Sequence, residues 1–340
     1  MSSFPNLMRG KRILYVHGFA SSAQSGTVHR LRATFPEADV VAFDLPVDPN
    51  AALDLLRSKC EELHPDLILG TSMGGMFAEQ LHGYDRILVN PAFQIADTMR
   101  EHNMMGKQTF LNPRADGEQE FYVDKPLVKA YRDVSEQCFT GVNDDKSLVV
   151  GLFGDKDPLV HTYDLFLQHY PCAIRFHGEH RMDDHSFMHA VVPVIRWMDD
   201  RQERRQRPIV FISVDAMRDA YDKPVSSVQK AVMTLIETYN VYFLAPCPST
   251  DHAHAGGILT WLERYVDVPA YDHVVFTNQP QLLYGDYFVM KHVDASSLQP
   301  SLFAARPADA DMMGAVIAYG SDEFKTWEDI LVYFERLGGQ

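Results

Sequence analysis

The sequence predicts an α/β protein in which a doubly wound parallel sheet is followed by a second α/β domain. Short apolar runs rich in Val, Ile and Leu alternate with helix-length stretches along the chain. This alternation is typical of buried parallel strands joined by helices. The length of 340 residues exceeds the size at which one hydrophobic core keeps growing, so we expect two domains.

Six apolar runs in the first half have strand character: Ile13–Val16, Val40–Phe43, Leu67–Leu69, Ile87–Val89, Leu148–Phe153 and Ala173–Phe176. Sheets of this class place functional groups at the carboxyl ends of their strands. Between the fourth and fifth runs lies a long stretch, about residues 92–145, that is rich in polar, Met and aromatic residues. It is too long for a simple connection, and we expect it to form a small cap.

A second series of strand and helix signals follows a charged run that reads RQERRQR. We therefore predict one domain over residues 1–204 and a second, Rossmann-like domain over residues 205–340. The expected elements of the second domain are strands at Ile209–Val214, Val241–Leu244, His273–Phe276 and Tyr287–Val289, and helices at Ser226–Tyr239 and Ile258–Tyr265.

Composition and charge narrow the classes of function. The formal net charge of −15 at pH 7 argues against nucleic-acid binding, and the one basic run, Arg201–Arg207, is better explained as a solvated linker. No apolar stretch approaches the length of a membrane span or a signal peptide. The four cysteines are scattered without metal-ligand or disulfide spacing, which favours a reducing compartment. We expect a cytoplasmic protein.

The clearest motif is Gly70-Thr71-Ser72-Met73-Gly74, which joins an apolar strand to a helix-like stretch. A bare G-x-S-x-G arises by chance in on the order of one chain in ten of this length. Its position between strand and helix matches the nucleophile elbow of α/β-hydrolases, in which glycines let a serine sit on a sharp turn with its hydroxyl exposed. We predict Ser72 as the nucleophile.

The first strand runs into His17-Gly18-Phe19. A loop of this kind supplies one oxyanion donor in such enzymes, and the residue after the nucleophile supplies the other. The expected donors are the backbone N–H groups of Phe19 and Met73, whereas the His17 side chain has a structural role at the strand end.

The predicted acid lies after the fifth strand, in Gly154-Asp155-Lys156-Asp157. We choose Asp157, with Asp155 as the alternative, to orient and support a histidine base. The base is expected on the loop after the sixth strand, because a loop there can reach the serine hydroxyl. His180 is the first choice, and His185 and His177 are the alternatives.

The same loop carries several residues that are able to bind a metal: His177, His180, Asp183, Asp184, His185 and His189. They do not form a zincin pattern, and H-x-x-H on a loop is a looser signal than HExxH on a helix. We therefore predict no metal. The order Ser, Asp, His along the chain is that of α/β-hydrolases.

The first 200 or so residues resemble the small bacterial YqiA-type esterases of the α/β-hydrolase superfamily. The segments that carry the resemblance are ILYVHGFASSAQSGT, LILGTSMGGMFAEQL, LVNPAF, GLFGDKDPLV and GEHRMDDHSF. The resemblance implies cofactor-free hydrolysis of carboxylic esters or thioesters through an acyl-enzyme. Ser72, Asp157 and His180 fall on matching positions, although the usual G-G-H reads G-E-H here.

The second half is similar to haloacid-dehalogenase-like domains, nearest the cytosolic deoxyribonucleotidases, in FISVDAMRDAY, VYFLAPCPS, ILTWLERYV and VVFTNQPQLLYGDYFV. That family uses two aspartates in D-x-D, but this chain has Asp215 at the first position and Met217 in place of the second aspartate. The resemblance also places Ala245 where a phosphate-binding Ser or Thr is expected, Pro280 in place of a lysine, and Met290 and Lys291 in place of metal-binding acids. It therefore implies a catalytically inactive domain.

There are two alternative functions. In the first, the whole chain is a non-catalytic binding or scaffold protein, but the intact order of the triad residues argues against this. The second domain, whose GDY segment and strand framework remain, is the alternative place for nucleotide binding or phosphatase activity.

Overall fold

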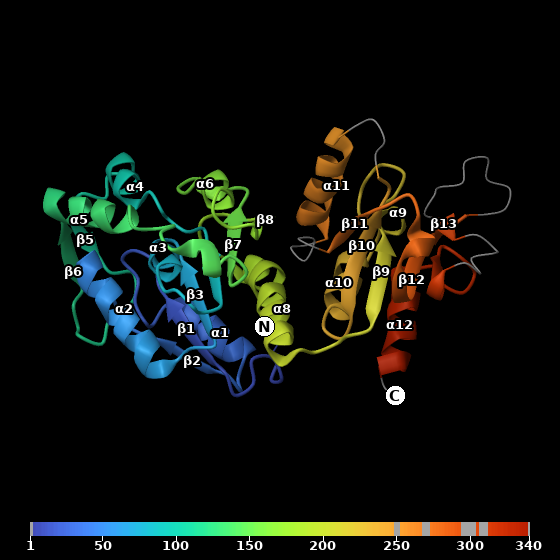
Figure 1. Cartoon of the computed structure of the whole chain (residues 1–340), viewed down its shortest axis with the longest axis horizontal. Coiled ribbons are helices and arrows are strands. Elements are labelled where there is room, and N and C mark those ends of the chain that lie inside the picture. The colour runs from blue at the N-terminus through green and yellow to red at the C-terminus, as the bar shows by residue number, and fades with distance from the viewer. Residues whose placement is uncertain (1–2, 248–251, 267–272, 294–303, 306–311, 339–340) are drawn as a thin grey trace. The chain divides into compact units, whose positions relative to one another are not determined.

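The structure is a computed structural model that describes residues 3–247, 252–266, 273–293, 304–305 and 312–338. The chain divides into two compact units, Met1–Gln202 (unit 1) and Glu203–Gln340 (unit 2) (Figure 1). Within the described ranges, every helix is too short or too polar to cross a lipid bilayer.

Unit 1 is built on a six-stranded parallel sheet in the order β2-β1-β3-β4-β7-β8. Its strands are β1 (Arg12–Val16), β2 (Asp39–Ala42), β3 (Leu67–Thr71), β4 (Arg86–Val89), β7 (Val149–Gly154) and β8 (Ala173–Phe176). The chain crosses from β1 to β2 on one side and then returns to β3 on the other, so the strand order reverses at β1. Such a reversal opens a crevice at the carboxyl ends of β1 and β3.

The strands of unit 1 form because their side chains are buried on both faces. All four residues of β4 are buried, as are four of the five in β3, which is the pattern of a central parallel strand. The connecting helices are α1 (Gly26–Thr34), α2 (Pro49–Leu63), α3 (Met73–Glu79), α6 (Tyr163–Leu167), α7 (Asp184–Ser186) and α8 (Val192–Glu203), with a π-helix at Phe187–Val191. The predicted parallel α/β class is confirmed.

Residues 92–145 fold into α4 (Ile95–Glu101), an antiparallel hairpin of β5 (Gly106–Thr109) and β6 (Glu120–Val123), α5 (Lys125–Ser135) and a short 3-10 turn, Val142–Asp144. We call this segment the cap. Helix α5 contacts α4 and also α2 (Figure 1). Its apolar residues Val128, Tyr131 and Val134 are buried in the same hydrophobic cluster as the sheet. The cap therefore shares the core of unit 1.

Unit 2 has a second parallel sheet in the order β11-β10-β9-β12-β13, with β14 paired to β12. Its strands are β9 (Ile209–Ser213), β10 (Asn240–Ala245), β11 (Val274–Phe276), β12 (Tyr284–His292), β13 (Ala304–Ala305) and β14 (Met313–Tyr319). Its helices are α9 (Val214–Met217), α10 (Val228–Leu235), α11 (His252–Tyr265), α12 (Trp327–Gly338) and a 3-10 turn at Pro280–Leu282. The α/β class predicted for this unit is confirmed as well.

Candidate active site

Ser72 lies on a sharp turn between β3 and α3, at the crevice formed by the reversal of strand order. Its φ of 55° and ψ of −122° are a strained combination for a residue with a side chain. A Cβ added at Gly70 would lie 2.4 Å from the carbonyl oxygen of Gly74, and one added at Gly74 would lie 2.0 Å from the carbonyl oxygen of Val16. Both positions require glycine, because the strand and the helix approach too closely for any side chain.

The structure brings Ser72, His180 and Asp157 together in one chain of hydrogen bonds. The Nε2 atom of His180 lies 3.0 Å from Ser72 Oγ, and its Nδ1 atom lies 2.8 Å from Asp157 Oδ2. The Asp157 side chain is buried, with 2% exposed, whereas the His180 side chain is 16% exposed. With a proton on Nδ1 facing the carboxylate, Nε2 is left to accept a hydrogen bond from the Ser72 hydroxyl.

The environment of Asp157 keeps this carboxylate ionised. Burial raises its pKa, but hydrogen bonds from His180 and from the backbone N–H groups of Leu159 and Val160 outweigh burial and lower the pKa below the ordinary value of 3.8. Those two N–H groups lie 2.8 and 3.0 Å from Oδ1. The anion therefore persists beside the histidine at neutral pH.

The alternative acid and bases lie elsewhere. Asp155 pairs with His177, whose Nδ1 atom is 2.9 Å from Asp155 Oδ2, and both side chains are more than one third exposed. His185 is exposed and its ring lies against that of His189, with 4.2 Å between centroids. None of these three alternatives is hydrogen-bonded to Ser72 among the described contacts. The histidines of this loop thus separate into different pairs, and the described part of the chain holds no group of three or more metal-ligating side chains.

The loop after β1 lies directly beside the serine. A Cβ added at Gly18 would be 3.3 Å from Ser72 Cβ and 3.8 Å from Ser72 Oγ, so only glycine leaves space for a substrate there. Phe19 follows Gly18, and Met73 opens α3, whose first N–H groups have no partner within the helix. The two expected oxyanion donors therefore lie on the loop and the helix end that flank Ser72.

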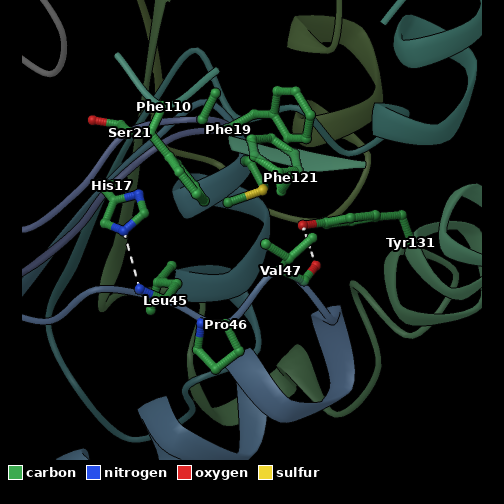
Figure 2. Close-up of a pocket in the computed structure, with 11 residues that line it drawn as sticks. His17, Phe19, Ser21, Leu45, Pro46, Val47, Phe110, Phe121 and Tyr131 are labelled. Atoms are coloured by element: carbon green, nitrogen blue, oxygen red, sulfur yellow. Dashed lines mark hydrogen bonds between the residues drawn. The ribbon is translucent and has the colours of Figure 1, made fainter. Parts of the chain in front are cut away.

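His17 holds this loop in place. Its Nε2 atom accepts a hydrogen bond of 3.2 Å from the Leu45 N–H (Figure 2), and its Nδ1 atom lies 2.8 Å from the Gly18 carbonyl oxygen. Burial lowers the pKa of His17, so the ring is neutral and donates through Nδ1. Fixing the Gly18 carbonyl also fixes the direction of the Phe19 N–H, because both belong to one planar peptide.

Asn90 is a site residue that the sequence did not predict. It directly follows β4 with a left-handed φ of 45° and is almost fully buried. Its Nδ2 atom donates to the carbonyl oxygens of Glu179 and His180 at 3.1 and 3.2 Å, and its Oδ1 atom accepts from the Gly154 N–H at 2.7 Å. One amide thus joins the loop of the base to the loop of the acid. The signal available in the sequence was an Asn directly before Pro91 at a strand end, a context typical of a fixed turn.

In unit 2, Asp215 lies in α9, just after β9, and its Oδ1 atom is 3.1 Å from the Arg218 guanidinium. Met217 is fully buried, and Ala245 at the end of β10 is buried too. Asp286 of the GDY segment accepts a hydrogen bond from the Ile209 N–H at 2.7 Å. Ile209 is at the amino end of β9, whereas Asp215 follows the carboxyl end of that strand. This donor set does not fit Mg²⁺, which prefers several carboxylate oxygens.

Met290 and Lys291 lie within β12, where both pair with β14, and Pro280 opens the 3-10 turn that precedes β12. The positions that the resemblance assigns to metal-binding acids and to a lysine are thus part of the sheet and of a turn.

Known proteins with similar structures are α/β-hydrolases. Est1E from Butyrivibrio proteoclasticus is 15% identical with a TM-score of 0.42, covering 60% of this chain and 93% of that one. A monoacylglycerol lipase from Paleococcus ferrophilus is 16% identical with a TM-score of 0.41, covering 56% of this chain and 94% of that one.

Two sequence matches were found. A protein named as a 5'(3')-deoxyribonucleotidase from Vibrio phage KVP40 is 24% identical over 114 residues, which are 34% of this chain and 60% of that protein. The match thus spans less than two thirds of that relative. The second match is to a family model: over residues 12–140, this chain is similar to the uncharacterised protein family UPF0227. The matched part holds Ser72, Phe19 and Met73 and ends before Asp157 and His180.

Proposed function

We propose that unit 1 is a serine hydrolase that cleaves carboxylic esters or thioesters through an acyl-enzyme on Ser72. The observation that supports this most strongly is the continuous hydrogen-bonded chain from Ser72 Oγ through His180 to the buried carboxylate of Asp157. A strained serine elbow next to two candidate backbone donors is the arrangement that acyl transfer requires. No cofactor is needed for this chemistry.

The reaction proceeds in two halves. His180 Nε2 takes the proton from Ser72 Oγ as the oxygen attacks the acyl carbon, and the carbonyl becomes an oxyanion held by the N–H groups of Phe19 and Met73. Collapse of this intermediate expels the alcohol or thiol, which receives the proton from His180. A water molecule then gives a proton to His180 and attacks the acyl-enzyme, and the acid leaves as Ser72 regains its proton. Asp157 stabilises the imidazolium in both halves.

The direct test is hydrolysis of p-nitrophenyl butyrate by the wild type and by Ser72→Ala, with circular dichroism to establish that both are folded. We expect kcat to fall by about 10⁶-fold, to background, in the variant. A fluorophosphonate probe should label the wild type and leave Ser72→Ala unlabelled. If the folded wild type neither hydrolyses esters nor takes the label, the chain is a non-catalytic binding protein.

A matched pair of variants tests which carboxylate supports the base. Asp157→Asn removes the charge beside His180 and favours the wrong tautomer, so kcat should fall by about 10⁴-fold. Asp155→Asn makes the same chemical change in the exposed pair with His177 and should leave kcat within a few-fold of the wild type. Equal losses in both variants would contradict the assignment.

We infer that unit 2 does not hydrolyse phosphate esters. The buried Met217 stands where a second catalytic aspartate would be needed, and Asp215 is engaged by Arg218. The full chain should therefore release no phosphate from deoxyribonucleoside monophosphates with Mg²⁺. Turnover that Asp215→Asn abolishes would overturn this inference.

A further inference from the structure

A pocket of about 250 Å³ lies beside the candidate oxyanion donors (Figure 2). Phe19 and Met73, whose N–H groups would hold the oxyanion, both line it. An acyl group whose carbonyl oxygen is bound by those amides therefore has this pocket next to it. The other lining residues come from the loop after β1, from the segment before α2 and from the cap: His17, Ala20, Ser21, Leu45, Pro46, Val47, Phe110, Phe121 and Tyr131.

The lining of the pocket suits an apolar, uncharged ligand. None of the described residues that line it carries a charge at neutral pH, because burial lowers the pKa of His17 and raises the pKa of Tyr131. The polar groups already have partners in the protein: both His17 nitrogens are hydrogen-bonded, and the Tyr131 hydroxyl donates to the Val47 carbonyl at 3.0 Å. Ser21 Oγ accepts from the Asn112 amide at 3.1 Å. A charged acyl group would find no oppositely charged side chain among the lining residues.

The pocket is small. Its space of about 250 Å³ includes the open mouth, so the enclosed part is smaller than this. The enclosed part therefore suits a short acyl chain.

The cap wall of the pocket is fastened to the loop after β1. The Leu111 N–H donates to the Ala20 carbonyl at 2.7 Å, and Ser22 Oγ donates to the Pro113 carbonyl at 2.7 Å. Phe121 also contacts Phe19 edge to face, with 5.3 Å between ring centroids. The wall cannot recede to admit a longer chain without breaking these contacts.

Tyr131 closes the pocket on the side facing away from His17 (Figure 2). Its side chain is only 1% exposed, and its bond to Val47 fixes the ring. We propose, on the basis of the proposed hydrolase function, that this pocket binds the acyl group, that it favours short uncharged chains, and that Tyr131 limits the length of the chain.

The test compares kcat/KM for p-nitrophenyl esters from acetate to dodecanoate. In the wild type, each methylene that enters the pocket should raise kcat/KM by about fourfold until the chain meets Tyr131, and the dodecanoate should fall at least tenfold below the best substrate. Tyr131→Ala should raise the ratio of dodecanoate to butyrate hydrolysis at least tenfold. Tyr131→Phe keeps the ring and should keep the chain-length preference.

Phe121→Ala, on the partly exposed cap strand, opens the same wall with less effect on the core and should shift the preference in the same direction. If Tyr131→Ala does not fold, the chain-length preference of Phe121→Ala tests the proposal instead. A wild type that prefers chains of ten or more carbons, or folded variants that keep the wild-type preference, would overturn the acyl pocket while the hydrolase function stands. Absence of hydrolysis across the whole series would overturn both.

Discussion

Replacement of Asn90 by Gly should separate the positioning of the base from the chemistry of the triad. The substitution deletes one amide group and adds no backbone strain, because glycine adopts a φ of 45° freely. It removes three hydrogen bonds: two to the carbonyls of Glu179 and His180, and one from the Gly154 N–H. The catalytic side chains themselves are unchanged.

The size of the effect follows from those contacts. At about 1 kcal/mol for each lost hydrogen bond, the free energy of unfolding should fall by about 3 kcal/mol. The loop that carries His180 loses its attachment to the loop of Asp157, and a displacement of about 1 Å at a reacting group costs about 10²-fold in rate. Asn90 does not line the acyl pocket, so KM should change little.

Steady-state kinetics with p-nitrophenyl butyrate, together with urea unfolding, measure both effects. Asn90→Gly should show kcat reduced by about 10²-fold with KM within about threefold of the wild type. Leu56→Ala is the matched control, since Leu56 is buried in α2, outside the loops that carry the triad, and the truncation costs about 2–5 kcal/mol. The reasoning is refuted if folded Asn90→Gly keeps the wild-type kcat, or if Leu56→Ala loses kcat to the same extent.

Three further predictions concern stability. Gly74→Ala should abolish the folded state of unit 1 in a urea titration, because its Cβ would lie 2.0 Å from a carbonyl oxygen, whereas Gly26→Ala, with no atom within 4 Å of the added Cβ, should fold normally. The lowered pKa of His17 means that the unfolded chain binds this proton first as the pH falls through the ordinary value of 6.5, so His17 loses its stabilising effect below that pH. The difference in unfolding free energy between pH 7.5 and 5.5 should therefore be smaller in His17→Gln than in the wild type, and an unchanged difference would count against a neutral ring. Asp145→Asn should lower the unfolding free energy by about 3 kcal/mol, because it leaves the fully buried Arg86 guanidinium without its carboxylate partner at 2.6 Å; a loss under 1 kcal/mol would show that the pair does not stabilise the fold.

The sheet of unit 1 was predictable because its strands are nearly continuous runs of buried aliphatic residues. The turn at Ser72 was predictable because it needs glycine at positions 70 and 74, and these glycines form a recognisable G-x-S-x-G motif in the sequence. The catalytic roles of Ser72, Asp157 and His180 stay predictions until the kinetic experiments are done.

Other features depend on contacts that no local pattern encodes. The role of Asn90 depends on two loops that meet it from distant parts of the chain, and the neutral state of His17 depends on its burial. In unit 2 the prediction was incomplete, since β12 extends over Tyr284–His292 and a further strand, β14, was missed although MGAVIAY is an apolar run. Helix α12 was indicated only by the helix-like context of Trp327, and its buried residues Trp327, Ile330, Leu331 and Phe334 have helical spacing.

Both ends of the cap are held by residues outside it. At its start, the Ala92 N–H donates to the carbonyl of Ser72, in the turn after β3, at 3.0 Å, and at its end, Asp145 is bound by Arg86 of β4. The three triad residues lie outside residues 92–145 in the sequence, whereas the cap wall of the acyl pocket lies within this segment. Insertions, deletions or an exchanged hairpin within this segment would alter which acyl chains are accepted without replacing a triad residue. Substrate selectivity is therefore able to evolve separately from the rate of the chemical step.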